Sequence, residues 1–327
     1  MAAVAAVAGR ASGAVGLAAR HLESGESLTW NAEDQFGTAS MIKVAIHAAV
    51  LRRARLGQFS LDDEVTVRPS DLAGGSGVLA ELRPGLRCTV SDLCTLMIVV
   101  SDNTATNMLI ELCGGAGTVN DDFAALGFPG FRLNRPISIP PPPLALPDDG
   151  DPAPASAGPA PSGPLATVSL GDFCELMARL HAGMVVDAEA SARIITVMRY
   201  QQHQALFPRA WLAVAAPFHR PAQDAPALAH KTGYVGGTRT DAGLLLLPDG
   251  GGTVAYAAAA DGLADRTMSA LAEGDEILGR LGAIVLARWW PGPRPVPVRD
   301  GWLPEDGWLP EDGCLPGERN GRLPAEG

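Results

Sequence analysis

The sequence predicts an α+β fold in which the two ends of the chain form an antiparallel sheet and the middle forms an inserted all-helical lobe. Three observations indicate this arrangement. Strand patterns occur near the N-terminus and again after residue 231, helical patterns fill most of the interval, and a final helical pattern closes the globular part. The first and last segments can therefore pair into one sheet. With 327 residues, 47% of them hydrophobic, the chain can bury a large core.

The N-terminal region predicts a short helix followed by a strand pair. Residues 1–10 are rich in alanine and carry no basic residue ahead of the apolar run, so we expect a first helix rather than an export signal. Residues 14–22 are typical of a strand, 23–27 of a tight turn and 28–31 of the returning strand. These strands would begin the sheet.

Helical patterns dominate the middle of the chain. Residues 40–56 are helical in composition, and Gly57 is a stop signal. A later helix begins with a sequence that resembles a capping box, Ser169 to Asp172. The further helices are expected at 89–100 (N-capped by Thr89 or Ser91), at 104–113, at 169–181 and at 187–206.

Two segments lack any regular pattern. Residues 136–164 are rich in proline, alanine, serine, glycine and aspartate, which predicts a long mobile loop. Residues 292–327 repeat Trp-Leu-Pro-Glu-Asp-Gly and then lose the repeat. A proline every six residues is incompatible with a helix or a strand, so we expect a disordered tail.

The region after residue 231 returns to strands. Residues 242–247 and 253–260 predict a hairpin around the turn 248–250, and 275–290 predict a closing helix. The predicted domain organisation is one catalytic domain over 1–291, followed by the tail. Its two parts are an α/β lobe (about 1–38 and 215–291) and a helical lobe (about 39–214).

Composition excludes several classes of partner. A net charge of −11 argues against nucleic acid and against an anionic membrane surface, and no apolar run is long enough to span a membrane. Five cysteines and six histidines show no metal-type spacing, so we expect free buried thiols, no metal and no cofactor. We therefore expect a monomeric cytoplasmic protein with a small-molecule substrate. Secretion is the alternative if the true N-terminus lies upstream.

Lysine is rare, and its positions are informative. Only two of the 25 basic side chains, Lys43 and Lys231, are lysine, and the other 23 are arginine. A guanidinium stays protonated at any working pH, whereas a buried amine can lose its proton and act as a base. An arginine-biased chain is therefore expected to keep lysine where arginine cannot replace it.

The first lysine belongs to a Ser-x-x-Lys sequence, Ser40 to Lys43, at the start of a predicted helix. This spacing places the hydroxyl and the amine on one helix face, one turn apart. A serine hydroxyl is a weak nucleophile until a base removes its proton, and a desolvated Lys43 could be that base. Alone, the motif is also compatible with a solvated surface lysine.

Two further motifs contain polar groups suited to the same reaction. Ser101, Asp102 and Asn103 follow an apolar helical run; Ser101 could relay a proton, and Asn103 could bind an amide. An ordinary helix N-cap is the alternative for this turn. The second lysine opens Lys231-Thr232-Gly233 on a predicted edge strand, where a cation and a hydroxyl can hold a carboxylate.

Together, and in this order, the three motifs resemble those of class A β-lactamases and penicillin-binding proteins. The resemblance extends from about Val15 to Trp290 and includes the contexts Thr38 to Val44 and Val100 to Asn107. It implies a five-stranded antiparallel sheet flanked by terminal helices, together with the helical lobe. It also implies a serine hydrolase. The competing motifs Gly-x-Ser-x-Gly, His-Glu-x-x-His and the P-loop do not occur in the sequence.

The resemblance implies a role for each motif residue in catalysis. Ser40 would be the acylated nucleophile, Lys43 its base or proton relay, and Ser101 the group that passes the proton to the leaving nitrogen. The backbone N–H groups of Ser40 and Tyr234 would form the oxyanion hole.

The same resemblance implies a set of substrate-binding residues. Asn103 would hold the side-chain amide of the substrate. Lys231 and Thr232 would bind its carboxylate, and Arg239 would add a second cation. Gly233 would let the substrate approach the strand backbone.

The chain departs from the family pattern where a glutamate should activate the deacylating water. In the family this glutamate follows an Arg-Leu-Asp-Arg-like segment, here Arg132 to Arg135, and Ile137 stands at about its position. Losing a positioned general base typically costs about 10²–10⁴-fold in rate. The next carboxylates, Asp148, Asp149 and Asp151, belong to the Pro-rich segment, which is poorly suited to hold a base.

A second departure concerns a disulfide found in some family members. Cys94 matches one of its two positions, but His47 occupies the other, so the bridge cannot form here.

Three hypotheses for function remain. The first is a β-lactamase-like serine hydrolase that opens a β-lactam or a related amide or ester through an acyl-Ser40 intermediate, as in β-lactam catabolism and the response to antibiotics. The second is a D-alanyl peptidase, esterase or transacylase of the same fold. The third is a β-lactam-binding or sensing protein that is acylated without turnover.

Overall fold

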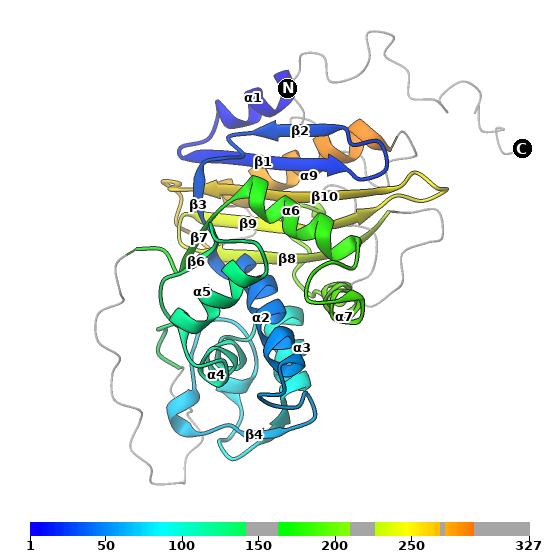
Figure 1. The fold of residues 1–327 in the computed structure, drawn as a ribbon. Coiled ribbons are helices and arrows are strands. Elements are labelled where there is room, and N and C mark those ends of the chain that lie inside the picture. Colours follow the sequence, from blue (N-terminus) through cyan, green and yellow to red (C-terminus); the bar gives the residue numbers. More distant parts are fainter. Residues whose placement is uncertain (142–162, 210–225, 269–271, 291–327) are drawn as a thin grey trace, which may run out of the picture.

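The computed structural model describes residues 1–141, 163–209, 226–268 and 272–290. Its central element is a five-stranded antiparallel sheet in the order β2-β1-β10-β9-β8, so strands from both ends of the chain are neighbours (Figure 1). The predicted α+β fold is therefore confirmed. The strands are β1 (Ala14–His21), β2 (Ser27–Trp30), β8 (Ala227–Val235), β9 (Thr238–Leu246) and β10 (Thr253–Asp261).

Helices cover both faces of this sheet. α6 (Leu170–His181) packs on one face, α9 (Glu273–Trp289) packs on the other, and α1 (Ala2–Ala8) packs against α9. Successive side chains of a strand point to opposite faces. On β10, for example, Ala257 belongs to the core on the α6 side and Tyr256 to the core on the α9 side. A strand buried on both faces is apolar along most of its length, as β10 is between Thr253 and Asp261.

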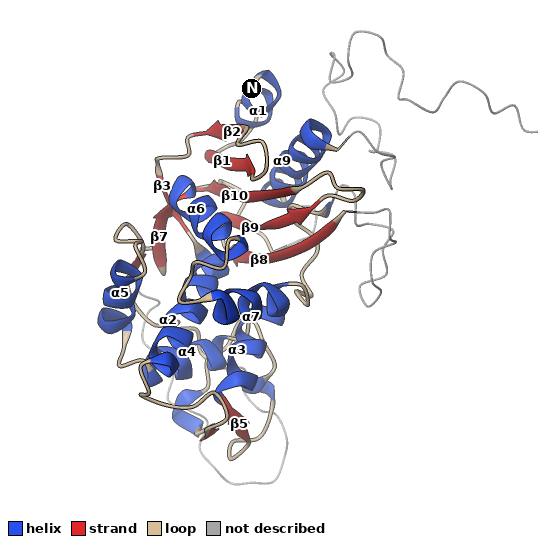
Figure 2. Ribbon diagram, turned by 45° about the vertical axis from the view of Figure 1, so that its right-hand side comes forward, coloured by secondary structure: helices blue, strands red, loops and turns tan. Residues whose placement is uncertain are grey.

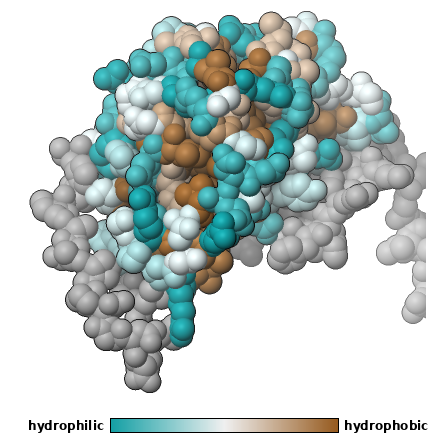
Figure 3. All heavy atoms as spheres, turned by 60° about the horizontal axis from the view of Figure 1, so that its bottom comes forward, coloured by the Kyte–Doolittle hydropathy of each residue, from teal (hydrophilic) through white to brown (hydrophobic). Residues whose placement is uncertain are grey.

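The helical lobe lies beside the edge strand β8, at the lower end of the molecule in Figures 1 and 2. Hydrophobic and hydrophilic side chains alternate in patches on the face that Figure 3 turns toward the viewer. The helices of this lobe are the 3₁₀-helices η1 (Ala39–Ile42), η2 (Pro69–Asp71) and η3 (Leu79–Glu81) and the α-helices α2 (Lys43–Arg55), α3 (Val90–Val99), α4 (Asn103–Leu112), α5 (Ala116–Ala125) and α7 (Ala188–Met198). The short strands are β3 (Gln35–Gly37), β7 (Ala166–Ser169) and β6 (Arg132–Leu133) in one sheet, and β4 (Glu64–Thr66) and β5 (Arg87–Thr89) in another.

Capping residues explain where several helices begin and end. Of the two caps considered for α3, Thr89 is the one that acts: its hydroxyl accepts the amide N–H of Asp92, and the Asp92 carboxylate accepts from the Thr89 amide. The Ser169 side chain accepts the Asp172 amide and caps α6, and the Asp187 side chain accepts the Ala190 amide and caps α7, in both cases without the reciprocal bond. Gly57 follows α2 with φ 74°, the left-handed conformation that glycine adopts readily.

Several expected boundaries were wrong. The helix predicted over 187–206 ends at Met198, because the polar residues after it hydrogen-bond to the end of α3 instead of continuing the helix. The strand predicted to begin at Ala242 begins at Thr238 and includes polar residues. Helix α5 and the short strands β3 to β7 were not predicted. Residues 142–162 of the Pro-rich segment and the tail from residue 291 lie outside the described residues.

The first helix is confirmed as α1, and the cysteine prediction holds wherever it can be examined. Cys88, Cys94, Cys113 and Cys174 are free and buried, and Cys314 lies outside the described residues. His47 is also completely buried, and burial lowers its pKa to about 3. Within the part of the chain that the structure describes, no helix has the length and apolarity needed to cross a bilayer.

Candidate active site

The candidate nucleophile lies at the junction between the sheet and the helical lobe. Ser40 is in η1, which packs on β8 and β9. The Thr240 hydroxyl donates a hydrogen bond of 2.7 Å to the Thr38 carbonyl and ties the entry of η1 to β9. A Cβ atom on Gly233 would lie 2.7 Å from the same carbonyl and 3.0 Å from the Ala39 Cβ atom. Only glycine therefore lets strand β8 approach the start of η1 this closely.

Backbone strain marks two places in this site. Ala39, just before Ser40, has φ 44°, and Ser101 has φ 58°. Residues with side chains rarely adopt this left-handed region, and such strain is concentrated at functional sites. Surrounding contacts maintain both conformations, so the positions of the two serines are closely determined.

Lys43 is completely buried and makes three hydrogen bonds to the Ser-Asp-Asn turn. Its Nζ atom donates to the Ser101 carbonyl (2.7 Å), the Ser101 Oγ atom (3.1 Å) and the Asn103 Oδ1 atom (2.8 Å). Burial, and to a lesser extent the nearby Lys231 ammonium, hold the pKa of Lys43 well below its usual range, although Asp102 partly opposes this shift. The neutral amine that a general base requires is therefore accessible at ordinary pH.

The Ser-Asp-Asn turn is held in place from both sides. The Asp102 carboxylate accepts the Ala105 amide and caps α4, and it also accepts two amides from residues 78–79. Asn103 donates from Nδ2 to the Gly74 carbonyl at 2.8 Å. The Ser76 hydroxyl donates to the Ser101 carbonyl at 2.7 Å. Asp102 is thus a structural residue of the turn, whereas Ser101 and Asn103 face Lys43.

The second lysine is also buried, but it differs electrostatically from the first. Burial lowers the pKa of Lys231 to about 7, and the Asp241 carboxylate partly offsets this effect. Its Nζ atom donates to the carbonyl of Thr232 at 2.7 Å. The buried Thr232 hydroxyl has no hydrogen-bond partner among the described residues. A buried hydroxyl without a partner is costly, and a bound ligand could satisfy it.

Arg239 does not join this group. Its side chain is buried on the α9 side of the sheet, where Nε donates to the Asp275 carboxylate at 2.5 Å. Three further N–H groups donate to the carbonyls of Val235, Thr238 and Thr267. All of these bonds would have to break before the guanidinium could reach a substrate, so the expected second cation is not available in this arrangement.

The expected oxyanion hole lies where β8 meets η1. Tyr234 follows Gly233, the residue that contacts the segment before Ser40, and pairs with Arg239 across the β8–β9 ladder. Its ring is largely buried, which raises the pKa of the phenol, and the Arg239 guanidinium lies 5.0 Å from the ring centroid. The ring is thus fixed on its strand, and the backbone of Gly233 and Tyr234 lies near Ser40.

The segment after Arg135 forms an apolar wall of the site. The Asn107 side chain binds Ile137 twice: Nδ2 donates to the Ile137 carbonyl (2.8 Å), and Oδ1 accepts its amide (2.9 Å). The Ile139 carbonyl accepts the Gly74 amide, next to the carbonyl that Asn103 binds. Ile137 is held firmly, and its side chain is buried. Ile137 stands at about the position where the family resemblance places the glutamate, but its side chain has no basic group.

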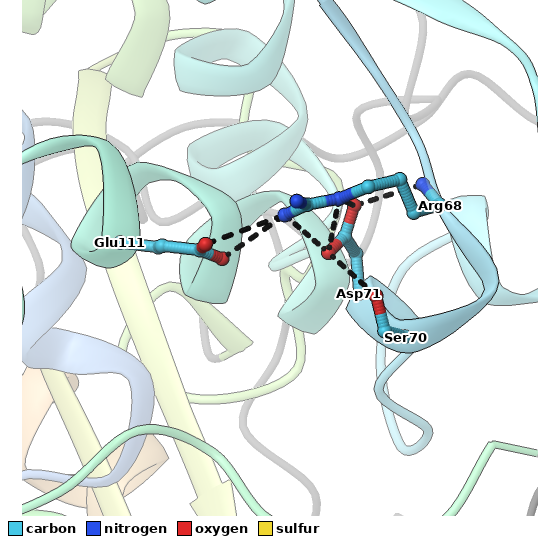
Figure 4. A network of polar contacts seen from close by, with 4 residues as sticks. All are labelled: Arg68, Ser70, Asp71 and Glu111. Atoms are coloured by element: carbon cyan, nitrogen blue, oxygen red, sulfur yellow. Dashed lines mark hydrogen bonds and ion pairs between the residues drawn. The ribbon is translucent and has the colours of Figure 1, made fainter.

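A cavity of about 330 Å³ lies along this segment, between residues 137–141 and α4. Figure 4 shows the polar network beside it: the Arg68 guanidinium bonds to Asp71 and also to Glu111 of α4. Arg68 and Glu111 are exposed, so their ion pair contributes little to stability. Within the described residues, no group of three His, Cys, Asp or Glu side chains is arranged to hold a metal ion.

Sequence reasoning assigned no role to three residues at the site. Ser76 lies in a Gly-Gly-Ser-Gly stretch, a signal for a loop that passes close to another chain segment. Asn107 is the only polar residue in the apolar run of α4 after Thr106 and before Glu111. His203 lies beyond the end of α7, and its ring lies 6.0 Å from the Tyr234 ring.

Comparison with known proteins agrees with the observed fold. The sequence model of the beta-lactamase enzyme family matches residues 1–289. A β-lactamase of Rhodobacter capsulatus is 36% identical over 121 residues. That match covers 37% of this chain and only 41% of the Rhodobacter protein.

Solved structures extend the similarity over most of the chain. A β-lactamase from Sphaerobacter thermophilus has a TM-score of 0.72 at 28% identity, covering 89% of this chain and 97% of its own. A mutant of PBP-A, solved as an acyl-enzyme complex with penicillin G, has a TM-score of 0.68 at 25% identity. That similarity covers 88% of this chain and 94% of PBP-A. A class A β-lactamase from Mycobacterium abscessus, at 21% identity, shares the fold with a TM-score of 0.69.

Proposed function

The chain belongs to the beta-lactamase enzyme family, and from this we propose that it is a serine hydrolase whose Ser40 is acylated by a β-lactam or a related amide or ester, with slow release of the acyl group. One observation carries the proposal. The completely buried Lys43 amine bonds to both Ser101 and Asn103, and its pKa is strongly lowered. A lysine of this kind suits proton transfer rather than the formation of a surface ion pair.

Acylation would proceed in two proton-linked steps. Neutral Lys43 removes the Ser40 hydroxyl proton as Oγ attacks the substrate carbonyl carbon. The backbone N–H groups of Ser40 and Tyr234 stabilise the negative oxygen that forms. The Lys43 ammonium then returns a proton through the Ser101 hydroxyl, 3.1 Å away, to the leaving nitrogen as the C–N bond breaks. The acyl group remains on Ser40, and Lys43 is again neutral.

The remaining motif residues would orient the substrate. Lys231 and the unpartnered Thr232 hydroxyl are suited to a carboxylate. Asn103 would bind the substrate's amide, although its Nδ2 atom donates to the Gly74 carbonyl in the free protein. The substrate amide would share or displace that bond, which lowers the expected contribution of Asn103 to affinity.

The release step is where a second candidate function arises. Ile137, held by Asn107 at the position where a glutamate is expected, cannot activate water. The nearest carboxylates along the chain, Asp148, Asp149 and Asp151, lie outside the described residues. This observation favours a protein that is acylated once and stays acylated, as a sensor of β-lactams would be. Transfer of the acyl group to an acceptor other than water is the peptidase or transacylase alternative.

Incubation with a chromogenic cephalosporin separates these functions. Sustained hydrolysis supports a β-lactamase, and a burst of one equivalent followed by very slow turnover supports a sensor. Turnover that rises when D-amino acids or amines are added supports a transacylase. Absence of reaction with the cephalosporin, together with hydrolysis of p-nitrophenyl esters, supports an esterase. If Ser40→Ala protein retained full hydrolysis, the proposal would be refuted in every form.

A further inference from the structure

The segment 199–207 connects the helical lobe with the sheet. The Gln201 amide group donates to the Ile98 carbonyl (3.0 Å), and the Gln202 backbone N–H donates to the Val99 carbonyl (3.0 Å). At its other end, the Phe207 amide donates to the buried Asp241 carboxylate of β9 at 3.2 Å. The segment is therefore fixed to the end of α3 that carries Ser101 and to the sheet that carries Lys231.

His203 lies in the middle of this connecting segment. The Val100 carbonyl, immediately before Ser101, is close enough to raise the pKa of the ring, and the ring lies 6.0 Å from that of Tyr234, immediately after Lys231-Thr232-Gly233. It is partly exposed rather than sealed in the core. His203 therefore spans the gap between two of the three motifs, on a fixed backbone, and remains accessible to a ligand.

Among the described residues, the charged groups that act on the His203 ring are cationic. Lys231 has a buried ammonium, and the Thr232 hydroxyl has no partner among the described residues. Arg239, the expected second cation, is bonded to Asp275 and to three carbonyls on the α9 side. A carboxylate placed here would satisfy the hydroxyl and neutralise the ammonium, but it would still lack its second cationic donor.

We propose that His203 is that donor: with Lys231 and Thr232 it forms the pocket for the substrate's carboxylate, and it takes up a proton when the carboxylate binds. The inference rests on the proposed function for the identity of the substrate. The pocket itself is defined by residues that need no reaction to bind an anion.

The charges around His203 determine whether carboxylate binding takes up or releases a proton. Burial is the main cause that lowers its pKa below 6.5. Lys231 and His230 of β8 and Lys43 of α2 lower the pKa further, whereas the Val100 carbonyl raises it. The ring is thus neutral in the free protein near pH 7. A carboxylate adds the missing negative charge and raises the pKa of His203, so binding takes up a proton from solvent.

Two substitutions and one control test the proposal. The rate constant to measure is the second-order rate constant of Ser40 acylation, for a chromogenic cephalosporin and for its methyl ester, which lacks the carboxylate charge. His203→Gln should lower the acylation rate constant for the carboxylate substrate by about 10-fold or more, which is the contribution of a charge-assisted hydrogen bond. The rate constant for the ester should fall by less than about twofold. His203→Arg should restore the rate at pH 8. Gln202→Ala, an exposed side chain on the same segment, should behave as wild type.

Equal losses on the two substrates, or no loss on either, would overturn the proposal. A separate arm requires no acylation: the His203 ring is titrated by NMR with and without sodium acetate, and His203→Gln assigns its signal. The pKa of His203 should rise with acetate. An unchanged pKa overturns the carboxylate pocket even if Ser40 reacts. A raised pKa in a protein that no β-lactam acylates supports the pocket and refutes the proposed function alone.

Discussion

The two walls of the candidate site differ sharply in chemistry. On the wall formed by α2 and the Ser-Asp-Asn turn, Lys43 bonds to Ser101 and Asn103 with a strongly lowered pKa. On the wall formed by residues 137–139, two hydrogen bonds from Asn107 fix the backbone of Ile137, but the Ile137 side chain is apolar. Both walls have a fixed backbone, but only the first carries a group that can act as a general base.

This contrast shows that acylation and release are supplied by separate parts of the fold. Lys43 and Ser101 are placed by α2, α3 and the turn between α3 and α4. Among the described residues, the hydrogen bonds from the wall at Ile137 go to Asn107 of α4 and to the loop at Gly74. A change on the second wall can therefore alter release without disturbing the groups that acylate Ser40.

The largest expected effect is the loss of the nucleophile. Ser40→Ala removes the atom that attacks the substrate, so covalent labelling by a fluorescent penicillin, followed on a denaturing gel, should fall to background. Ser60→Ala, in an exposed turn, serves as the matched control and should label like wild type. Labelling of Ser40→Ala protein at the wild-type rate would mean that another residue is acylated.

The second effect tests the base on the first wall. Lys43→Arg keeps the positive charge but removes the group that can lose a proton, so acylation should slow by about 10²–10⁴-fold. Stopped-flow measurement of acylation by a chromogenic cephalosporin checks this value. Because a buried guanidinium is larger than an ammonium, the melting temperature of the variant must be measured alongside. A folded Lys43→Arg protein with an unchanged acylation rate would exclude Lys43 as the base.

The third effect adds the missing chemistry to the second wall. Ile137→Glu should accelerate release of the acyl group by about 10²-fold. This is the low end of the range for a general base, because no neighbouring side chain in the wall is arranged to orient a carboxylate. The measurement is the steady-state rate of cephalosporin hydrolysis. Ile139→Glu, on the same segment but exposed, is the matched control and should change turnover little. Equal turnover by the two variants would show that the position of Ile137 has no special relation to the acyl group.

The smallest effect concerns Lys231 and pH. Its pKa of about 7 means that the ammonium loses its proton as pH rises through 7, and the attraction for a carboxylate is lost with it. The second-order rate constant for an anionic β-lactam should therefore fall by about 10-fold from pH 6 to pH 8, the proton loss expected one unit above the pKa. A neutral ester, measured over the same range, should not show this decline. An identical decline for both substrates would assign the titration to another group.

Much of the fold followed from local signals in the sequence. The strand pair, the hairpin and the capped helices were found because their patterns are strong and local, as with Thr89 and Ser169. The short strands β3, β6 and β7 were missed because two to four residues carry no periodicity. The end of α7 was misplaced because bonds between Gln201 and the end of α3, which are tertiary, outweigh helix propensity.

In the site, too, features set by local sequence could be predicted, and features set by tertiary packing could not. The motifs identified which residues could meet, because a Ser-x-x-Lys spacing on a helix fixes two side chains by itself. They could not show that Arg239 faces Asp275 instead of the substrate side, because that depends on packing against α9. Nor could they reveal Ser76, Asn107 or His203, whose roles depend on contacts with segments distant in the sequence.

The most direct test of the central claim is time-resolved intact mass spectrometry of wild-type protein mixed with benzylpenicillin. The contrast between the two walls predicts that one penicilloyl group appears on each molecule within seconds, maps to the Ser40 peptide, and persists long after free penicillin is removed. Rapid consumption of penicillin with no accumulated adduct would contradict the account, because it would show that release is faster than acylation despite Ile137.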